Sequence, residues 1–355
     1  MFKLSHDTEL LLEDIENRID PDTEDDFRKQ WEDFLYDRFT GDIFVPKRKQ
    51  LSQPAVNLPK VNINDALEDY DLMLRSQMQT VSGALNTNSA NTCIRANYGT
   101  GIMTSILGAE IFTMPRENNT LPTTRSLNDT EAVRAIVEKG LPDINNGFGS
   151  RVFDFGELCL EVFEKYPKIK KYVTVYHPDT QGPLDVTELL WGGEMFYAMY
   201  DEPELVHGML NLTCDLYEAV MDKWYTLYPQ NTYMNPHWNW IWHKGAIVLR
   251  DDSAMNLSPE LYAEFGAPYD SRLLQRYDGG IVHFCGRGDH YIDTLCNIPK
   301  MYGINMSQPQ YNDMEKIYQA TVDKGLKIIN FKLDRAEQDK HRPGGFNHCL
   351  ASQKN

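Results

Sequence analysis

The sequence predicts an α/β protein, a (β/α)8 TIM barrel that follows an N-terminal helical extension. Three observations support this prediction. The chain has 355 residues, a normal length for one eight-stranded barrel with an extension. Hydrophobic residues make up 41% and charged residues 25% of the chain, which is typical of a globular protein with a large core. From about residue 91, short apolar runs alternate with helical segments, which indicates βα units and a parallel sheet.

The first 90 residues are expected to form a helical arm, and residues 91–355 the barrel domain. Apolar residues recur every three or four positions over 8–19 and 24–39, among many acidic residues. A proline-punctuated connector follows, and another helix is expected over 64–85 with Asn64 as its N-cap.

Eight apolar runs are the candidate barrel strands. The expected strands are 93–98, 110–114, 172–176, 246–250, 280–284, 302–306, 327–332 and 345–349. The main helices expected between them are 129–139, 152–165, 188–200, 202–228, 258–277, 289–295 and 312–324. Eight strands separated by helices is the count for a closed barrel, although an open doubly wound sheet would alternate similarly.

The charge balance limits the partners that this protein can bind. A formal net charge of −17 argues against nucleic acid and against anionic membrane surfaces. The sequence contains no run of about eighteen apolar residues, and its start lacks the apolar core of a signal peptide. The six cysteines are scattered, as expected for free thiols. We therefore expect a cytoplasmic protein that acts on a small molecule.

A candidate metal site lies at the expected strand ends, where the chemistry of parallel barrels gathers. His283 and Cys285 leave the fifth expected strand on one face, because residues i and i+2 of a strand do so. Cys349 ends the eighth expected strand, so these three residues could converge at the barrel mouth. One histidine and two cysteines can hold Zn²⁺ with one position open. The competing interpretation is a buried structural His/Cys pair.

Other polar residues are also expected at the strand ends. They are Asn97, Tyr98, His177, Asp179, Asp251, Asp252 and Gln308. We assign catalytic roles to Asp251, Asp252 and His177, and substrate contacts to the other four. For the two adjacent aspartates, a helix cap or loop solvation explains the residues equally well. The loop 237–243 holds three tryptophans, and core packing, an interface and a lid over a flat ligand remain open for it.

Several segments carry a resemblance to a known family. They are Asn97-Tyr98-Gly99-Thr100-Gly101, Leu107-Gly108-Ala109-Glu110, residues 251–269 and His283-Phe284-Cys285-Gly286. Over roughly residues 90–355 the chain resembles the uroporphyrinogen decarboxylase superfamily. Its His-x-Cys pair with a distant cysteine is similar to the zinc-dependent, cobalamin-linked methyltransferase branch. The resemblance implies methyl transfer between a methylcorrinoid on a partner protein and a thiol or another small acceptor or donor. It also implies His283, Cys285 and Cys349 as the zinc ligands.

The first expected strand departs from the decarboxylases of that superfamily. They carry an arginine-rich segment there that binds substrate carboxylates, whereas residues 94–98 of this chain contain a single arginine, Arg95. We therefore expect that this protein is not a uroporphyrinogen decarboxylase. A barrel of the same superfamily with another lyase activity and a non-catalytic binding barrel remain alternatives, and a homodimer remains open.

Overall fold

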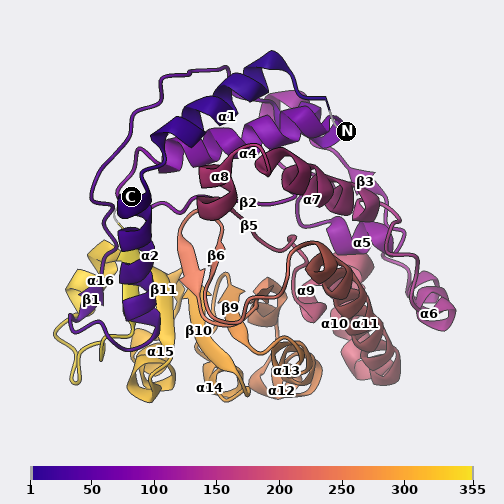
Figure 1. The fold of residues 1–355 in the computed structure, drawn as a ribbon. Coiled ribbons are helices and arrows are strands. Elements are labelled where there is room, and N and C mark those ends of the chain that lie inside the picture. The colour runs from indigo at the N-terminus through magenta and orange to yellow at the C-terminus, as the bar shows by residue number, and fades with distance from the viewer. Residues whose placement is uncertain (1–2, 354–355) are drawn as a thin grey trace.

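The largest sheet in the computed structural model, which describes residues 3–353, is parallel and has six strands (Figure 1). In spatial order its strands are β1 (Ile43–Phe44), β12 (Leu350–Gln353), β11 (Lys327–Lys332), β10 (Met301–Met306), β9 (Gly280–Phe284) and β8 (Ile247–Arg250). Every neighbouring pair in this order is parallel. The predicted mixed α/β fold with a parallel sheet is therefore confirmed.

The sheet does not close into a barrel through backbone hydrogen bonds. β2 (Cys93–Ile94) and β5 (Thr174–Val175) form a separate parallel pair, and within residues 3–353 no strand ladder joins that pair to the six-stranded sheet. A side chain bridges one gap, because Val248 of β8 donates its backbone N–H to His177 Nε2 at 3.1 Å. On the other side of the pair, Asn91 donates its N–H to Asn239 O at 2.6 Å.

A hairpin and an N-terminal helix cover the inner face of the sheet. The hairpin consists of β6 (Asn235–His237) and β7 (Ile241–His243), and the helix is α2 (Pro21–Leu35). The buried apolar residues that they share with the sheet are Phe27, Trp31, Phe34, Leu35, Phe44, Ile241, Trp242, Val248, Ile281, Ile329 and Ala351. Burial of this aromatic cluster joins the arm to the sheet.

The N-terminal arm contains more and shorter helices than the sequence predicted. Its other helices are α1 (His6–Arg18), α3 (Ile63–Glu68) and α4 (Tyr70–Ala84). The predicted helix over 64–85 divides at Asp69, because the Asp69 carboxylate accepts the N–H groups of Asp71 and Leu72 and so caps α4. Asn62, and not Asn64, caps α3.

The remaining helices lie around the sheet and the β2–β5 pair (Figure 1). The α-helices are α5 (Ile102–Ile106), α6 (Thr130–Lys139), α7 (Gly149–Phe163), α8 (Pro167–Tyr172), α9 (Pro183–Trp191), α10 (Glu194–Asp201), α11 (Pro203–Leu227), α12 (Pro259–Phe265), α13 (Ala267–Arg276), α14 (Ile292–Cys296), α15 (Met314–Ala320) and α16 (Leu333–Asp339). The 3₁₀ helices are η1 (Arg116–Asn118), η2 (Asp252–Asn256), η3 (Pro309–Tyr311) and η4 (Val322–Lys324). None of the helices in residues 3–353 combines the length and the apolar character needed to cross a bilayer.

Two of the predicted strands were wrong. The run 110–114 contributes only β3 (Ile111–Phe112), which pairs with β4 (Thr123–Thr124) in a separate antiparallel hairpin. The last strand was predicted over 345–349 but begins at Leu350. Gly344, Gly345, Asn347 and His348 all have positive φ angles, so the segment before β12 is a turn. Cys349 therefore precedes the strand that it was expected to end.

Candidate metal centre

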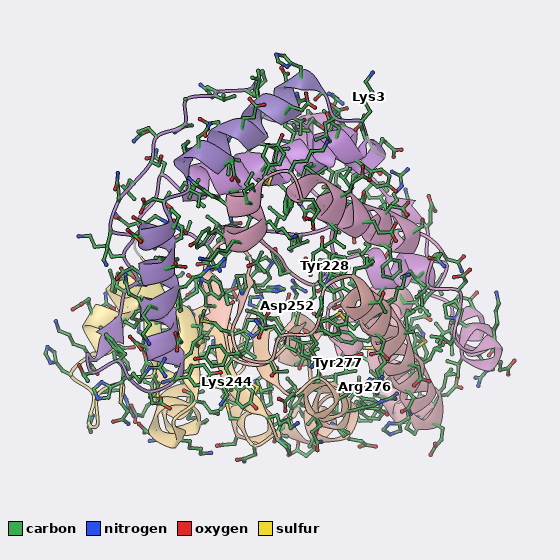
Figure 2. All side chains as sticks on the ribbon, in the orientation of Figure 1. Lys3, Tyr228, Lys244, Asp252, Arg276 and Tyr277 are labelled. Atoms are coloured by element: carbon green, nitrogen blue, oxygen red, sulfur yellow. The ribbon has the colours of Figure 1, made fainter. Side chains whose placement is uncertain are left out.

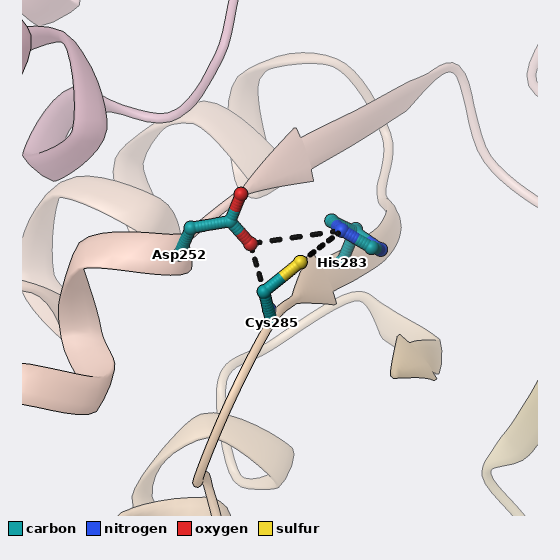
Figure 3. A group of neighbouring side chains, drawn as sticks. All are labelled: Asp252, His283 and Cys285. Atoms are coloured by element: carbon teal, nitrogen blue, oxygen red, sulfur yellow. Dashed lines mark hydrogen bonds and ion pairs between the residues drawn. The ribbon is translucent and has the colours of Figure 1, made fainter. Parts of the chain in front are cut away.

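Three potential metal ligands meet where β8 and β9 end (Figure 3). His283 lies in β9, Cys285 follows that strand, and Asp252 begins η2 directly after β8. His283 Nε2 lies 3.4 Å from Cys285 Sγ and 3.6 Å from Asp252 Oδ1. The three ligand atoms all lie within 4.8 Å of one another. Figure 2 shows Asp252 near the centre of the view, with Lys3 at the rim of the molecule.

Backbone pairing positions these groups. His283 stands opposite Arg250 of β8 and Asn305 of β10 in the sheet register. Cys285 donates its backbone N–H to Asp252 Oδ1 at 2.7 Å, which holds the carboxylate next to the thiol. The sequence prediction that His283 and Cys285 lie side by side agrees with this geometry.

The hydrogen bonds of Asn305 assign the tautomer of His283. Asn305 donates from Nδ2 to Ile329 O at 2.7 Å, so its Oδ1 faces the imidazole. His283 Nδ1 lies 2.6 Å from that oxygen and must donate to it. The lone pair of Nε2 is then free and points toward Cys285 and Asp252. Burial also lowers the pKa of His283, so the ring is neutral, as a metal ligand must be.

Cys285 is a protonated thiol in the absence of a cation. Burial, and to a smaller extent the negative charge of Asp252, raises the pKa of Cys285 to about 11. A contact from Sγ to Ser307 Oγ at 3.4 Å lowers this pKa but does not offset the rise. A bound cation would reverse this effect, because a coordinating thiol is deprotonated.

The ligand separations fit a zinc ion. With Zn–S near 2.3 Å and Zn–N and Zn–O near 2.0–2.2 Å, tetrahedral geometry places ligand atoms roughly 3.4–3.6 Å apart. The separations from His283 Nε2 are 3.4 Å to Cys285 Sγ and 3.6 Å to Asp252 Oδ1. One nitrogen, one sulfur and one oxygen would leave a fourth position for a substrate or water.

Cys349 does not join this group, so its prediction as a zinc ligand was wrong. Its Sγ lies 3.7 Å from Lys327 Nζ, at the start of β11. Lys327 pairs with Gly303, which pairs with Ile281 two residues before His283. Cys349 is therefore at the N-terminal end of the sheet, three strands from β9. The cause is the misplaced last strand, and Asp252 provides the third ligand group instead.

Asp251 faces away from the triad and toward the surrounding helices, so its predicted catalytic role is not supported. The residue is fully buried and contacts Asp270 of α13, which accepts a hydrogen bond from Tyr262 at 2.9 Å. Burial and the charge of Asp270 raise the pKa of Asp251 well above its usual value. A buried, neutral acid here cannot reach a substrate at the triad.

His177 also has a structural position in place of the predicted catalytic one. Its Nε2 accepts the N–H of Val248, and its Nδ1 donates to Pro178 O at 2.8 Å. Both ring nitrogens are therefore used by the backbone. Burial lowers the pKa of His177 to about 3, so the ring stays neutral.

Three of the four predicted substrate contacts, Asn97, Tyr98 and Asp179, instead contact other residues of the protein. Tyr98 is buried in the core and its ring packs against Phe148. Asp179 forms ion pairs with Arg95 and Arg250, and Asn97 accepts from Arg95 Nε at 2.8 Å.

Gln308, the fourth predicted substrate contact, binds the backbone next to the triad. Its Oε1 accepts the backbone N–H of Gly286 at 2.6 Å. Gly286 has a φ of 73° and directly follows Cys285, so Gln308 fixes the turn that places the thiol.

A cavity of about 700 Å³ adjoins the triad. Its lining residues are Trp238, Trp240, His283, Asn305, Met306, Ser307, Asn330, Phe331, Lys332, Leu333 and Asp334. The tryptophan-rich loop is the turn of the β6–β7 hairpin, and Trp238 meets the His283 ring edge-on at 5.1 Å.

Sequence reasoning missed Asn305 and Ser307. The one available signal was a lone asparagine within the apolar run of β10, because a buried polar residue in a strand usually has a specific partner.

Neither protein-family models nor curated proteins match this chain in sequence.

Proposed function

We propose that this protein is a zinc-dependent methyltransferase that moves a methyl group between a corrinoid on a partner protein and a small thiol. The observation that carries the proposal is the triad of His283, Cys285 and Asp252, in which Asn305 directs a free imidazole lone pair at the other two ligands. In this proposal the parallel sheet is the core of a TIM barrel of the uroporphyrinogen decarboxylase superfamily.

The chemistry of the site fits thiol activation. A Zn²⁺ held there would lower the pKa of an entering thiol and keep it as a nucleophilic thiolate. Asn305 holds His283 in the coordinating tautomer, and the backbone of Cys285 orients Asp252. Trp238 packs edge-on against the imidazole and limits the directions from which a ligand can approach it.

A second reading of the same residues is a cysteine nucleophile. Cys285, His283 and Asn305 form a hydrogen-bonded chain of the type used by thiol hydrolases. The surroundings of Cys285 favour the metal site instead. The pKa of Cys285 is raised to about 11, and the Asp252 carboxylate beside Sγ opposes formation of a free thiolate.

Metal analysis tests the proposal. We expect about one tightly bound zinc per chain in the purified protein, and loss of that zinc in Cys285→Ala and Asp252→Ala. Cys349→Ala is the matched control, since it removes a thiol at the other end of the sheet and should retain the metal. Full zinc content in Cys285→Ala would refute the metal centre. Methylation of a small thiol by methylcobalamin, lost in the same two variants, would then test the transfer.

A further inference from the structure

A second cavity lies in the gap between β5 and β8, where the strand ladder is interrupted. Its volume is about 330 Å³, at the lower end of the range for small-molecule pockets. Residues 173–177 line one side of it, and Ala246, directly before β8, lines the other. It shares no lining residue with the cavity beside the triad, so the two are separate sites.

One edge of β5 faces this gap. The other edge pairs with β2, because Thr174 donates its backbone N–H to Thr92 O at 3.1 Å. Tyr176 donates its N–H to Ile94 O at 3.0 Å in the same way. In a parallel pair, the residues between such donors direct their backbone groups to the opposite edge. The N–H and C=O of Val175 therefore point toward β8.

The edge of β5 that faces β8 is unpaired. Within residues 3–353, no ladder joins the two strands, and no group of the protein bonds to Val175 N–H, Val175 C=O or Val173 C=O. Both valines are buried. Because buried backbone groups almost always have a partner, these three groups indicate that a ligand binds in the cavity.

Side chains occupy the facing edge of β8. His177 Nε2 accepts the backbone N–H of Val248 at 3.1 Å, and Tyr225 donates its hydroxyl to Ala246 O at 3.3 Å. These side chains take the positions that β5 would fill in a continuous sheet. The gap between the strands is therefore kept open by the protein itself.

The walls of the cavity fit a flat, neutral molecule. Its aromatic lining residues are Phe163, Tyr176, Trp224, Tyr225 and Tyr228. The two lysines that line it already have partners, because Lys170 Nζ binds Glu164 at 2.6 Å and Lys171 Nζ binds Tyr172 Oη at 2.6 Å. Aromatic walls favour a planar ring, and paired charges at the rim do not call for a charged one.

We propose that this cavity binds a neutral, planar nitrogen heterocycle that pairs with the free edge of β5. A ring N–H donates to Val173 C=O, and an adjacent ring nitrogen accepts Val175 N–H. In a complete sheet, one residue of a neighbouring strand makes both of these bonds. The inference does not depend on the triad or on the proposed function.

Calorimetric titration with three ring compounds tests the site. 7-Azaindole has the required N–H and ring nitrogen, indole lacks the ring nitrogen, and 1-methyl-7-azaindole lacks the N–H. We expect 7-azaindole to bind about tenfold more tightly than either of the others, because each of those leaves a buried backbone group unpaired. Hydrogen–deuterium exchange of the segment 172–178 should slow with 7-azaindole and not with indole.

Two leucine variants locate the binding. Leu160→Trp enlarges an exposed residue that lines the cavity, and it should weaken 7-azaindole binding about tenfold or more. Leu141→Trp makes the same change at an exposed leucine outside the cavity and should keep the parent affinity. Cys285→Ala should also keep it, which separates this site from the proposed function.

Other outcomes would overturn the inference. Equal affinities for the three compounds, or no binding of 7-azaindole at millimolar concentration, would exclude pairing with β5. Unchanged exchange of the segment 172–178 would do the same. Unchanged affinity in Leu160→Trp, or a loss of affinity in Cys285→Ala, would place the compound outside this cavity.

Discussion

At the scale of single residues, the metal centre depends on the amide of Asn305. Without this amide the imidazole of His283 could rotate or change tautomer. We predict that Asn305→Ala lowers zinc affinity by about 10- to 100-fold, the usual cost of removing such a supporting contact. Competition with a chromophoric chelator would measure it. Asn211→Ala, on the exposed face of α11, is the control and should not change the affinity.

Asp185 predicts a pH dependence of stability. It is buried and accepts the backbone N–H groups of Asp252 and Ser253, and burial followed by the charge of Asp252 raises its pKa to about 7. A raised carboxyl pKa in the folded state adds stability that is complete below the unfolded value of 3.8 and is lost as pH rises through 7. We predict that Asp185 alone contributes a loss of about 1–2 kcal/mol to the free energy of unfolding between pH 6 and pH 8.

Asp185→Asn should remove this contribution, which is measured as the difference between the parent and the variant in urea denaturation at pH 6, 7 and 8. The buried histidines His177, His237 and His243 have lowered pKa values, so they favour the unfolded state as pH falls through about 6.5. This effect is the same in the parent and the variant, so it cancels in the difference between them. An unchanged pH slope in the variant would contradict the prediction.

The sequence predicted part of the site because some of its geometry is local. His283 and Cys285 are two residues apart in a strand, so their proximity follows from the chain alone. The partnership with Asn305 depends on the register of β9 with β10, which no local pattern specifies. Asp252 was identified as functional, but its role next to Cys285 required the contact between neighbouring strand ends.

At the scale of elements, the pairing of β11 with β12 shifts register between Ile328 and Phe331, and Asn330 lies in this bulge with a φ of 60°. The stability of the protein should therefore depend on the residue at position 330. Asn330→Gly introduces a residue that adopts a φ of 60° readily, so we predict a stability close to that of the parent protein. Asn330→Val places a β-branched residue there and should cost about 1–3 kcal/mol. Chemical denaturation would compare the two variants. Equal stability would mean that the left-handed conformation is not required.

Long apolar runs were predicted well, and turns were not. The strands over 280–284 and 327–332 were predicted with the bounds that the structure has, because each run is buried and bordered by breakers. The predicted helices 188–200 and 258–277 each divide at glycines, at Gly192–Gly193 and at Gly266. The prediction of the last strand failed because the sequence 345–349 does not reveal that Gly345, Asn347 and His348 adopt positive φ angles and form a turn.

At the scale of the whole molecule, a buried ion pair joins separate segments of the N-terminal arm to one another. Arg48 binds Glu24 through Nε at 2.6 Å and Nη2 at 3.0 Å, and its Nη1 donates to the carbonyls of Ala84, Thr87 and Ala90. Both side chains are almost fully buried. We predict that Arg48→Met destabilises the protein by about 3–5 kcal/mol, because it leaves the Glu24 charge buried without a partner.

Urea denaturation would measure this loss. The control is Arg116→Met, which breaks an exposed pair with Asp65 and should cost at most about 1 kcal/mol. Similar losses in the two variants would show that the buried pair does not stabilise the packing within the arm.

The pairing of β1 with β12 also has a consequence during synthesis. Ile43 aligns with Leu350, so the partner of the first strand leaves the ribosome about 300 residues later. At about 5–20 residues per second, that delay is roughly 15–60 s. Meanwhile Trp31 and Phe34 of α2 lack the sheet face that buries them. The nascent chain therefore presents an aromatic helix that a chaperone can bind until translation reaches β12.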